Sequence, residues 1–213
     1  MTLLRIFCIV VFAAVVTIAA RDDGRVFAQS QPPAQTERKQ EDIDLDTQLY
    51  LLIGTNQETQ DKLPTALDAV IKHLRASLPF KNYRLAATLI NRVKNDGHLN
   101  LKWIGGPLLS SGPTSSAETP SFNEFRVNLV RLTRDDQGFG RIRMEGFSFG
   151  ARIPIQVALA SAAPPSTTIN YESTGLNTDI SMREAEPVVV GTLNVGPSGD
   201  AIILVMSAKK ATH

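Results

Sequence analysis

The end of the chain places the strongest constraint on the fold. Two apolar runs, "PVVVGTL" (187–193) and "AIILVMSA" (201–208), are joined by the turn-forming stretch "NVGPSGD". Strands lose the alternation of polar and apolar side chains when both faces of their sheet are covered. We therefore expect these runs to form the most buried hairpin of the protein, with Gly191 as a kink.

The segment before this hairpin, residues 176–183, alternates and predicts a strand with one solvated face. Its expected core-facing side chains are Leu176, Thr178, Ile180 and Met182. We expect this strand and the two apolar runs to form one antiparallel meander. Removing the last strand would then expose an apolar sheet edge.

Two more long alternating segments precede the meander. Residues 122–133 alternate, and residues 141–155 alternate again, with Gly146 and Gly150 predicting a bulge or bend. The expected core-facing side chains of the first segment are Phe125, Val127 and Leu129. This half of the chain is therefore predicted to be a mostly antiparallel β module, residues 122–210.

The region 46–106 carries a helical pattern between strand patterns. A strand is expected to end at Gly54, and a helix with Asp61 as its N-cap is expected to end near Ser77, because Pro79 disfavours helical geometry at the residue before it. Pro64 falls in the first helical turn, where it is tolerated. The apolar stripe of this helix is Leu67, Val70, Ile71, Leu74 and Leu78.

Two strands are predicted after the helix. Residues 82–93 are expected to place Tyr83, Leu85, Ala87 and Leu89 on one face, and residues 98–103 to place Leu99, Leu101 and Trp103 on one face. The intervening Asp96-Gly97 is a hairpin signal. The predicted fold class is α+β, a small strand-helix-strand-strand module at 46–106, a linker at 107–121 and the β-rich module.

The N-terminus has the pattern of an export signal. An uninterrupted apolar run from Ile6 to Ala20 follows Arg5, and Val26 and Ala28 are small residues that favour cleavage before Gln29. Residues 1–28 are therefore predicted to be a signal peptide. Cleavage after "TIAA" (17–20) and an uncleaved anchor helix are the alternatives. Residues 29–45 have the composition of a flexible tether.

The inventory of residues narrows the chemistry. Cys8, the only cysteine, lies in the predicted leader, so the mature chain would hold no disulfide, zinc-thiolate site or cysteine nucleophile. The 22 Lys+Arg and 21 Asp+Glu leave a net charge of +1, which disfavours nucleic-acid binding. We predict no cofactor and no metal site.

Candidate catalytic residues all have a simpler structural interpretation. His73 and His98 are expected on solvated faces and His213 is terminal, with no metal-ligand spacing among them. The carboxylate pairs Asp135-Asp136 and Glu184/Glu186 lie at predicted turns, where carboxylates cap local amides. Ser110-Ser111 lacks the nucleophile-elbow context of a catalytic serine. Glycines 105, 106 and 112 lack the spacing of a phosphate-binding loop. The aromatic residues Trp103, Phe147 and Phe149 could line a ligand groove, but a place in the core is the simpler interpretation.

Residues Thr178–Lys209 resemble the closing β-meander of secretins, the outer-membrane pore proteins of type II and type III secretion systems and type IV pili. The resemblance rests on "TDISMREAEPVVVGTL" and the hydrophobic strand after it, with Ala185 or Glu186 at a turn glycine of the family and Thr192 at its second glycine. More broadly, the chain is similar to exported bacterial proteins of unassigned function. The resemblance implies an envelope protein and brings no catalytic residue.

The sequence as a whole favours an exported, non-enzymatic protein of the periplasm or cell envelope that acts in binding or assembly. Its expected partner is another protein, or a second copy, at exposed sheet edges. Membrane contact is expected only through an uncleaved leader. A periplasmic ligand-binding module with a pocket between the two halves, and a hydrolase with an unrecognised site, are the alternatives.

Overall fold

The structure is a computed structural model, and it describes residues 43–58, 62–106, 108, 119–135, 137–159, 166–195 and 199–212. The chain divides into two units, Met1–Gln40 and Glu41–His213, and all described residues belong to the second. The predicted signal peptide and nearly all of the predicted tether lie outside the described residues.

The described part of this unit contains two antiparallel four-stranded sheets and one α-helix. Sheet A has the strand order β2-β1-β8-β7 and sheet B the order β3-β4-β5-β6. The elements are β1 (Asp44–Thr55), the 3-10 helix η1 (Thr65–Leu67), α1 (Asp68–Ser77), β2 (Asn82–Lys94), β3 (Gly97–Gly105), β4 (Ser121–Arg134), β5 (Gly140–Leu159), β6 (Ser166–Arg183), β7 (Val188–Val195) and β8 (Asp200–Lys210). The predicted α+β class with mostly antiparallel strands is confirmed.

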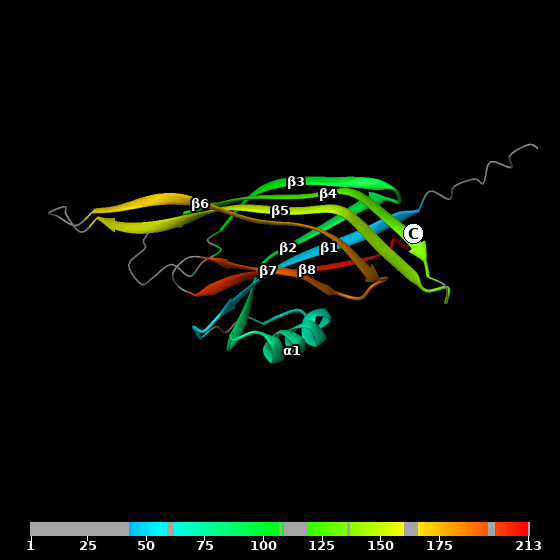
Figure 1. The fold of residues 1–213 in the computed structure, drawn as a ribbon, viewed down its shortest axis with the longest axis horizontal. Helices are drawn as coiled ribbons and strands as arrows, with labels where there is room; N and C mark the ends of the chain where they lie inside the picture. Colours follow the sequence, from blue (N-terminus) through cyan, green and yellow to red (C-terminus); the bar gives the residue numbers. More distant parts are fainter. Residues whose placement is uncertain are drawn as a thin grey trace, which may run out of the picture. The chain divides into compact units, whose positions relative to one another are not determined.

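Sheets A and B enclose the larger of two hydrophobic cores. Figure 1 shows sheet B as one layer over sheet A, with α1 on the other side of sheet A. Fully buried side chains of this core include Leu49 and Leu204 from sheet A and Phe125, Phe147 and Phe149 from sheet B. The space between these buried residues of the two sheets is therefore filled by side chains.

A smaller core lies between sheet A and the helix. The predicted stripe is confirmed, because Leu67, Val70, Ile71 and Leu74 are buried and Leu78 packs against them. The helix also ends at Ser77, as Pro79 predicts. Its N-terminal turn is 3-10, after Pro64, and the expected cap Asp61 lies outside the described residues.

Strand β8 explains the apolar run at the end of the chain. It lies between β1 and β7, so Leu204 and Met206 face the larger core while Ile203 and Val205 face the helix side. The prediction that this strand is covered on both faces is confirmed. The same prediction for β7 is wrong, because β7 is an edge strand in which Val188, Val189 and Val190 are only partly buried.

The predicted three-strand meander is also wrong. Strands β7 and β8 pair as a hairpin, but β6 pairs with β5 in the other sheet. A turn at Glu184-Ala185 takes the chain from sheet B to sheet A, and the Ala185 amide donates to the Ala208 carbonyl at 2.8 Å. The core-facing side of β6 is as predicted, since Leu176, Ile180 and Met182 contact the larger core.

The Asp96-Gly97 turn does not close a hairpin within one sheet. Strand β2 pairs with β1, and β3 pairs with β4, so this turn also connects the two sheets. Asp96 has a φ of 62°, and its amide donates to the Val130 carbonyl at 2.8 Å. The expected 46–106 module therefore has β1 and β2 in sheet A and β3 in sheet B. The strands on either side of residues 107–121, β3 and β4, belong to the same sheet.

Bulges account for two errors in the predicted core faces. The register of β1 with β2 shifts between Leu51 and Leu52, so Tyr83 and Leu85 face the helix side while Ala87 and Leu89 face the larger core. An extra residue in one strand reverses the side-chain alternation beyond it.

The second error lies in β4. Val130 is fully buried there in place of the expected Leu129, which is only partly buried. The bulge predicted at Gly146 is confirmed by its φ of 62° and by the register shift between Met144 and Phe147. Gly150 lies in regular pairing.

Candidate functional site

Sheet B offers one face to solvent, and this outer face carries a shallow hollow. The hollow has a volume of about 400 Å³. Its floor is at Gly150, where an added Cβ would meet nothing within 4 Å. The lining residues are Lys102, Trp103, Ile104, Phe122, Asn123, Glu124, Gly150, Ala151, Arg152, Ser173 and Thr174.

The register of sheet B explains why these residues meet. Ile104, Phe122, Arg152 and Ser173 occupy consecutive positions across β3, β4, β5 and β6, so they form one row on the outer face. Ile104 is 69% exposed and Phe122 is 42% exposed, which is unusual for large apolar side chains.

An aromatic cluster closes one side of the hollow. The rings of Phe122 and Tyr171 lie 5.5 Å apart, and the Arg152 guanidinium lies 5.8 Å from the centre of the Tyr171 ring. The Tyr171 hydroxyl donates to the Pro120 carbonyl at 3.3 Å. These contacts hold a cation and two rings beside an apolar surface.

The other side of the hollow is charged. The Glu124 carboxylate forms an ion pair with Arg126, with Oε1 2.7 Å from Nη2. Its Oε2 lies 3.6 Å from the Lys102 Nζ. All three side chains are at least one-third exposed, so these pairs order the rim more than they stabilise the fold. The hollow is thus apolar at its centre and polar at its rim, the usual composition of a binding surface.

A second feature lies where the outer strands of the two sheets approach each other. Strand β6 is at one edge of sheet B and β7 at one edge of sheet A, and each has a partner on one side only among the described residues. An added Cβ at Gly191 of β7 would lie 2.7 Å from Leu176 of β6, so the two edges are adjacent. We call this region the β6–β7 seam; its apolar residues are Leu176, Ile180, Val188, Val190 and Leu193, all partly buried.

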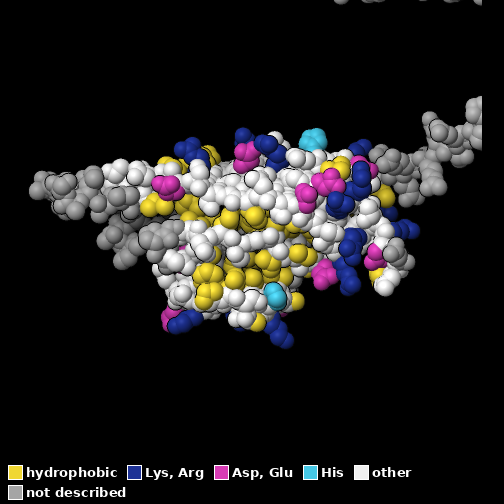
Figure 2. Space-filling model, viewed as in Figure 1, with side chains coloured by type: hydrophobic (Ala, Val, Ile, Leu, Met, Phe, Trp, Pro, Cys, Tyr) yellow, Lys and Arg dark blue, Asp and Glu magenta, His cyan; other side chains and the backbone are white. Residues whose placement is uncertain are grey.

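Figure 2 shows hydrophobic side chains gathered in a band between the layer of β3–β6 and the layer of β7 and β8. This band follows the β6–β7 seam in the same view as Figure 1. An open strand edge beside partly exposed apolar side chains can receive another strand. The seam is therefore a second candidate interaction surface.

The residues considered as catalytic candidates are dispersed. His73 lies on the exposed side of α1 and His98 on the outer face of β3, and both are exposed. His213, Asp136, Ser110, Ser111 and Gly112 lie outside the described residues. No group of three His, Cys, Asp or Glu side chains suited to a metal ion occurs within the described ranges.

The turn carboxylates act as amide caps, as predicted for Asp135. Its Oδ1 accepts from the amides of Gln137 at 3.0 Å and Phe139 at 2.9 Å. Glu184 caps a distant amide, that of Lys210, at 2.8 Å, and Glu186 is exposed. Trp103 lies at the hollow, while Phe147 and Phe149 are core residues.

Sequence reasoning identified Trp103 as a possible groove residue but did not find the hollow. The available signal was apolar Ile104 and Phe122 at positions where alternation requires polar side chains, since their neighbours Trp103 and Asn123 face inward. The pKa values of Tyr50 and Tyr83 are raised because both rings are buried, and neither tyrosine lines the hollow. No helix in the described part of the chain has the length and apolar character needed to cross a membrane.

No protein-family model and no curated protein matches the chain. Among solved structures it is similar to the type IV competence pilus secretin PilQ of V. cholerae, at 9% identity and a TM-score of 0.36, over 80% of this chain and 58% of that one. It is also similar to the InvG secretin domain of the Salmonella SPI-1 injectisome, at 11% identity and a TM-score of 0.35, over 81% of this chain and 64% of that one.

A third similar structure is the Klebsiella pneumoniae type II secretion system outer membrane complex of PulD, PulS and the PulC HR domain, at 11% identity and a TM-score of 0.33. That match covers 81% of this chain and 39% of the other. The chain thus spans less than two thirds of the length of each of these three proteins. The resemblance to secretin domains is therefore weak, at 9–11% identity and TM-scores of 0.33–0.36.

Proposed function

We propose that this chain is an exported, non-enzymatic protein of the periplasm or cell envelope that assembles with another protein, or with a second copy of itself, along the β6–β7 seam. The observation that carries the proposal is the adjacency of two open strand edges from opposite sheets. Each edge offers backbone donors and acceptors, and the apolar side chains between them offer surface to bury.

The composition of β6 supports this role. Proteins protect exposed edges with lysine, proline or very short strands. Strand β6 has 18 residues, with neither lysine nor proline among them. Ser, Thr and Asn make up half of the strand, which carries only three charged residues, Glu172, Asp179 and Arg183.

The test is the oligomeric state of the full-length chain, measured by size-exclusion chromatography with light scattering. Asn177→Lys with Thr192→Lys adds exposed charge to both edges of the seam, whereas Ile90→Lys adds charge to the exposed face of β2. We expect the parent and I90K to associate and N177K/T192K to remain monomeric. A parent that is strictly monomeric, or an assembly that N177K/T192K leaves intact, would contradict the proposal.

Export is tested separately. N-terminal sequencing of the protein from fractionated cells is expected to begin at Gln29 in the envelope fraction, because residues 1–28 have the pattern of a cleaved leader. A cytoplasmic protein that still begins at Met1 would contradict this part of the proposal and leave the seam proposal standing.

The hollow on sheet B supports a second candidate function, the binding of a small apolar ligand. Trp103 is the only tryptophan of the chain and its strand borders the hollow, so energy transfer from its half-buried ring to a bound probe reports on occupancy. An apolar fluorescent probe such as anilinonaphthalene sulfonate is expected to quench Trp103 in the parent. Gly150→Val would place a side chain in the hollow, where an added Cβ meets nothing within 4 Å, and should weaken quenching. Equal quenching in both proteins would exclude this function.

A further inference from the structure

Four arginines gather on the outer face of sheet B near the end where the two sheets are joined by turns. Arg131 of β4, Arg143 and Ser181 form one row across the sheet, and Thr133, Arg141 and Arg183 form the next. We call Arg131, Arg141, Arg143 and Arg183 the arginine cluster. All four side chains are exposed.

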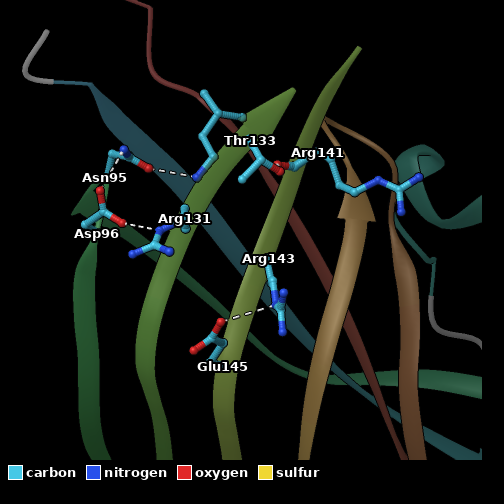
Figure 3. Close-up of polar contacts among 8 residues, drawn as sticks. Asn95, Asp96, Arg131, Thr133, Arg141, Arg143 and Glu145 are labelled. Carbon is cyan, nitrogen blue, oxygen red and sulfur yellow. Dashed lines mark hydrogen bonds and ion pairs between the residues drawn. The ribbon is translucent and has the colours of Figure 1, made fainter. Parts of the chain in front are cut away.

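Two members of the cluster are held by carboxylates. Figure 3 shows Arg131 reaching Asp96 in the β2–β3 turn, with Nε 2.5 Å from Oδ1, and Arg143 reaching Glu145, with Nε 3.2 Å from Oε1. The hydrogen bond to Asp96, with its charge, raises the pKa of Arg131. These two guanidinium groups are therefore fixed in place and already partly neutralised.

The other two members have no such partner. Arg141 and Arg183 are directly opposite each other on β5 and β6, and neither forms an ion pair with a carboxylate of the described residues. Like charges placed directly opposite on paired strands are destabilising. Figure 3 shows the Arg141 side chain directed away from Arg131 and Glu145, toward β6.

A second hollow of about 400 Å³ lies beside this pair, lined by Thr133, Arg141, Arg143, Asp179, Ile180 and Ser181. Its one carboxylate, that of Asp179, has Oδ1 occupied by the Gly146 amide at 2.6 Å. The Thr133 hydroxyl donates to the Arg141 carbonyl at 3.1 Å, which ties β4 to β5 beneath the cluster. Space, hydroxyl groups and the Arg141 guanidinium therefore meet at one place, and Arg183 lies directly opposite Arg141 on the neighbouring strand.

We propose that the arginine cluster binds a phosphate group, which the fork of donors on each guanidinium of Arg141 and Arg183 would contact. A bound anion would offset the repulsion between these two opposed cations. The phosphate could belong to a soluble phosphate compound or to the headgroup of an anionic lipid. This site adjoins the β6–β7 seam, with which it shares Ile180, but phosphate binding by the two guanidinium groups does not depend on assembly.

The first experiment titrates the full-length chain with pyrophosphate and follows binding by calorimetry. R141Q/R183Q is compared with R126Q, because Arg126 is exposed on the same face and is paired with Glu124. We expect R126Q to bind like the parent and R141Q/R183Q to bind at least tenfold more weakly. R141K/R183K should recover part of the affinity, since it restores charge without the bidentate fork.

A second experiment separates the two sources of phosphate. Vesicles of phosphatidylglycerol and of phosphatidylcholine are sedimented with each variant. The site is assigned to a lipid headgroup if the parent binds phosphatidylglycerol vesicles but not pyrophosphate, and R141Q/R183Q loses this binding. It is assigned to a soluble ligand if the parent binds pyrophosphate but not the vesicles, and R141Q/R183Q loses the binding of pyrophosphate. If R141Q/R183Q matches the parent in both experiments, the proposal is overturned.

Folding of the double variant is checked by urea unfolding. Because the substitution removes opposed like charges, its midpoint should be equal to or above that of the parent without ligand. Pyrophosphate should raise the midpoint of the parent by mass action and leave that of R141Q/R183Q unchanged. An equal rise in both proteins would overturn the proposal even where direct binding is too weak to fit.

Discussion

The Glu184 carboxylate accepts a hydrogen bond from the backbone amide of Lys210, with an Oε1–N distance of 2.8 Å. Glu184 follows the last strand of sheet B and Lys210 ends the last strand of sheet A. The amide of Glu184 in turn donates to the Gly140 carbonyl at 3.0 Å. One residue thus links the start of β5 to the end of β8.

Glu184→Ala is expected to lower the free energy of unfolding by about 1 to 2 kcal/mol, because a hydrogen bond between an ionised side chain and an amide is lost. Glu186→Ala is the matched control, since Glu186 is exposed, lies two residues away and should change stability by less than about 0.5 kcal/mol. Urea unfolding measures both. Equal effects of the two substitutions would show that the contact with Lys210 contributes nothing.

Ala185→Gly is expected to raise the free energy of unfolding by about 0.5 to 1 kcal/mol. Ala185 has a φ of 64°, a left-handed conformation that costs an L-residue about 1 to 2 kcal/mol and that glycine adopts without this cost. Glycine also increases the chain entropy of the unfolded state, which offsets part of the gain in stability. Ala69→Gly, within α1, is the control and should lower stability by about 1 kcal/mol. Thermal unfolding should therefore shift in opposite directions for the two variants.

Tyr83→Phe is expected to raise the free energy of unfolding by about 1 kcal/mol at neutral pH. The Tyr83 ring is 3% exposed and its hydroxyl is buried with no hydrogen-bond partner among the described residues. A buried polar group without a partner carries an uncompensated desolvation cost. A loss of stability in this variant would show that the hydroxyl has a favourable contact.

The same substitution has a pH signature. Burial raises the pKa of Tyr83 above 10.0, although the charge of Arg75 partly opposes the shift. The unfolded chain therefore loses this proton first, and stability falls as the pH rises from about 10 through the folded-state pKa. Tyr83→Phe removes this loss, so its stability should fall less above pH 10. Burial also raises the pKa of Tyr50, which leaves part of the alkaline loss in the variant.

Substitutions on opposite faces of β8 should be equally damaging. Ile203 and Leu204 are both fully buried, one against the helix and one between the sheets. Ile203→Ala and Leu204→Ala are each expected to cost about 2 to 5 kcal/mol, and Thr192→Ala on the exposed side of β7 less than about 0.5. Urea unfolding tests this; a mild effect at Ile203 would mean that α1 packs only loosely on sheet A.

Local pattern was sufficient to predict the element types, because each depends on side chains a few residues apart. The helix ends at Ser77 because Pro79 follows it, and the buried stripe from Leu67 to Leu74 has helical spacing. The double-sided burial of β8 was predicted from its loss of alternation. The absence of alternation does not distinguish the central strand β8 from the edge strand β7, however. Whether a strand lies at the centre or the edge of its sheet depends on partners that are distant in sequence.

For the candidate sites, the sequence could place Trp103, Arg141 and Arg183 on strands and on faces of those strands. It could not bring Arg141 opposite Arg183, or set Gly150 beneath Phe122, because cross-strand register is fixed by pairing over tens of residues.

The amino-acid sequence by itself determined that this chain forms strands around a cysteine-free core, where the helix lies and which side chains of most strands turn inward. Only the tertiary structure decided which strands share a sheet. The turns at Asp96-Gly97 and Glu184-Ala185 look like hairpin turns, yet both carry the chain from one sheet to the other. A turn constrains a few backbone angles, whereas the partner of each strand follows from burying one continuous core, a property of the whole unit.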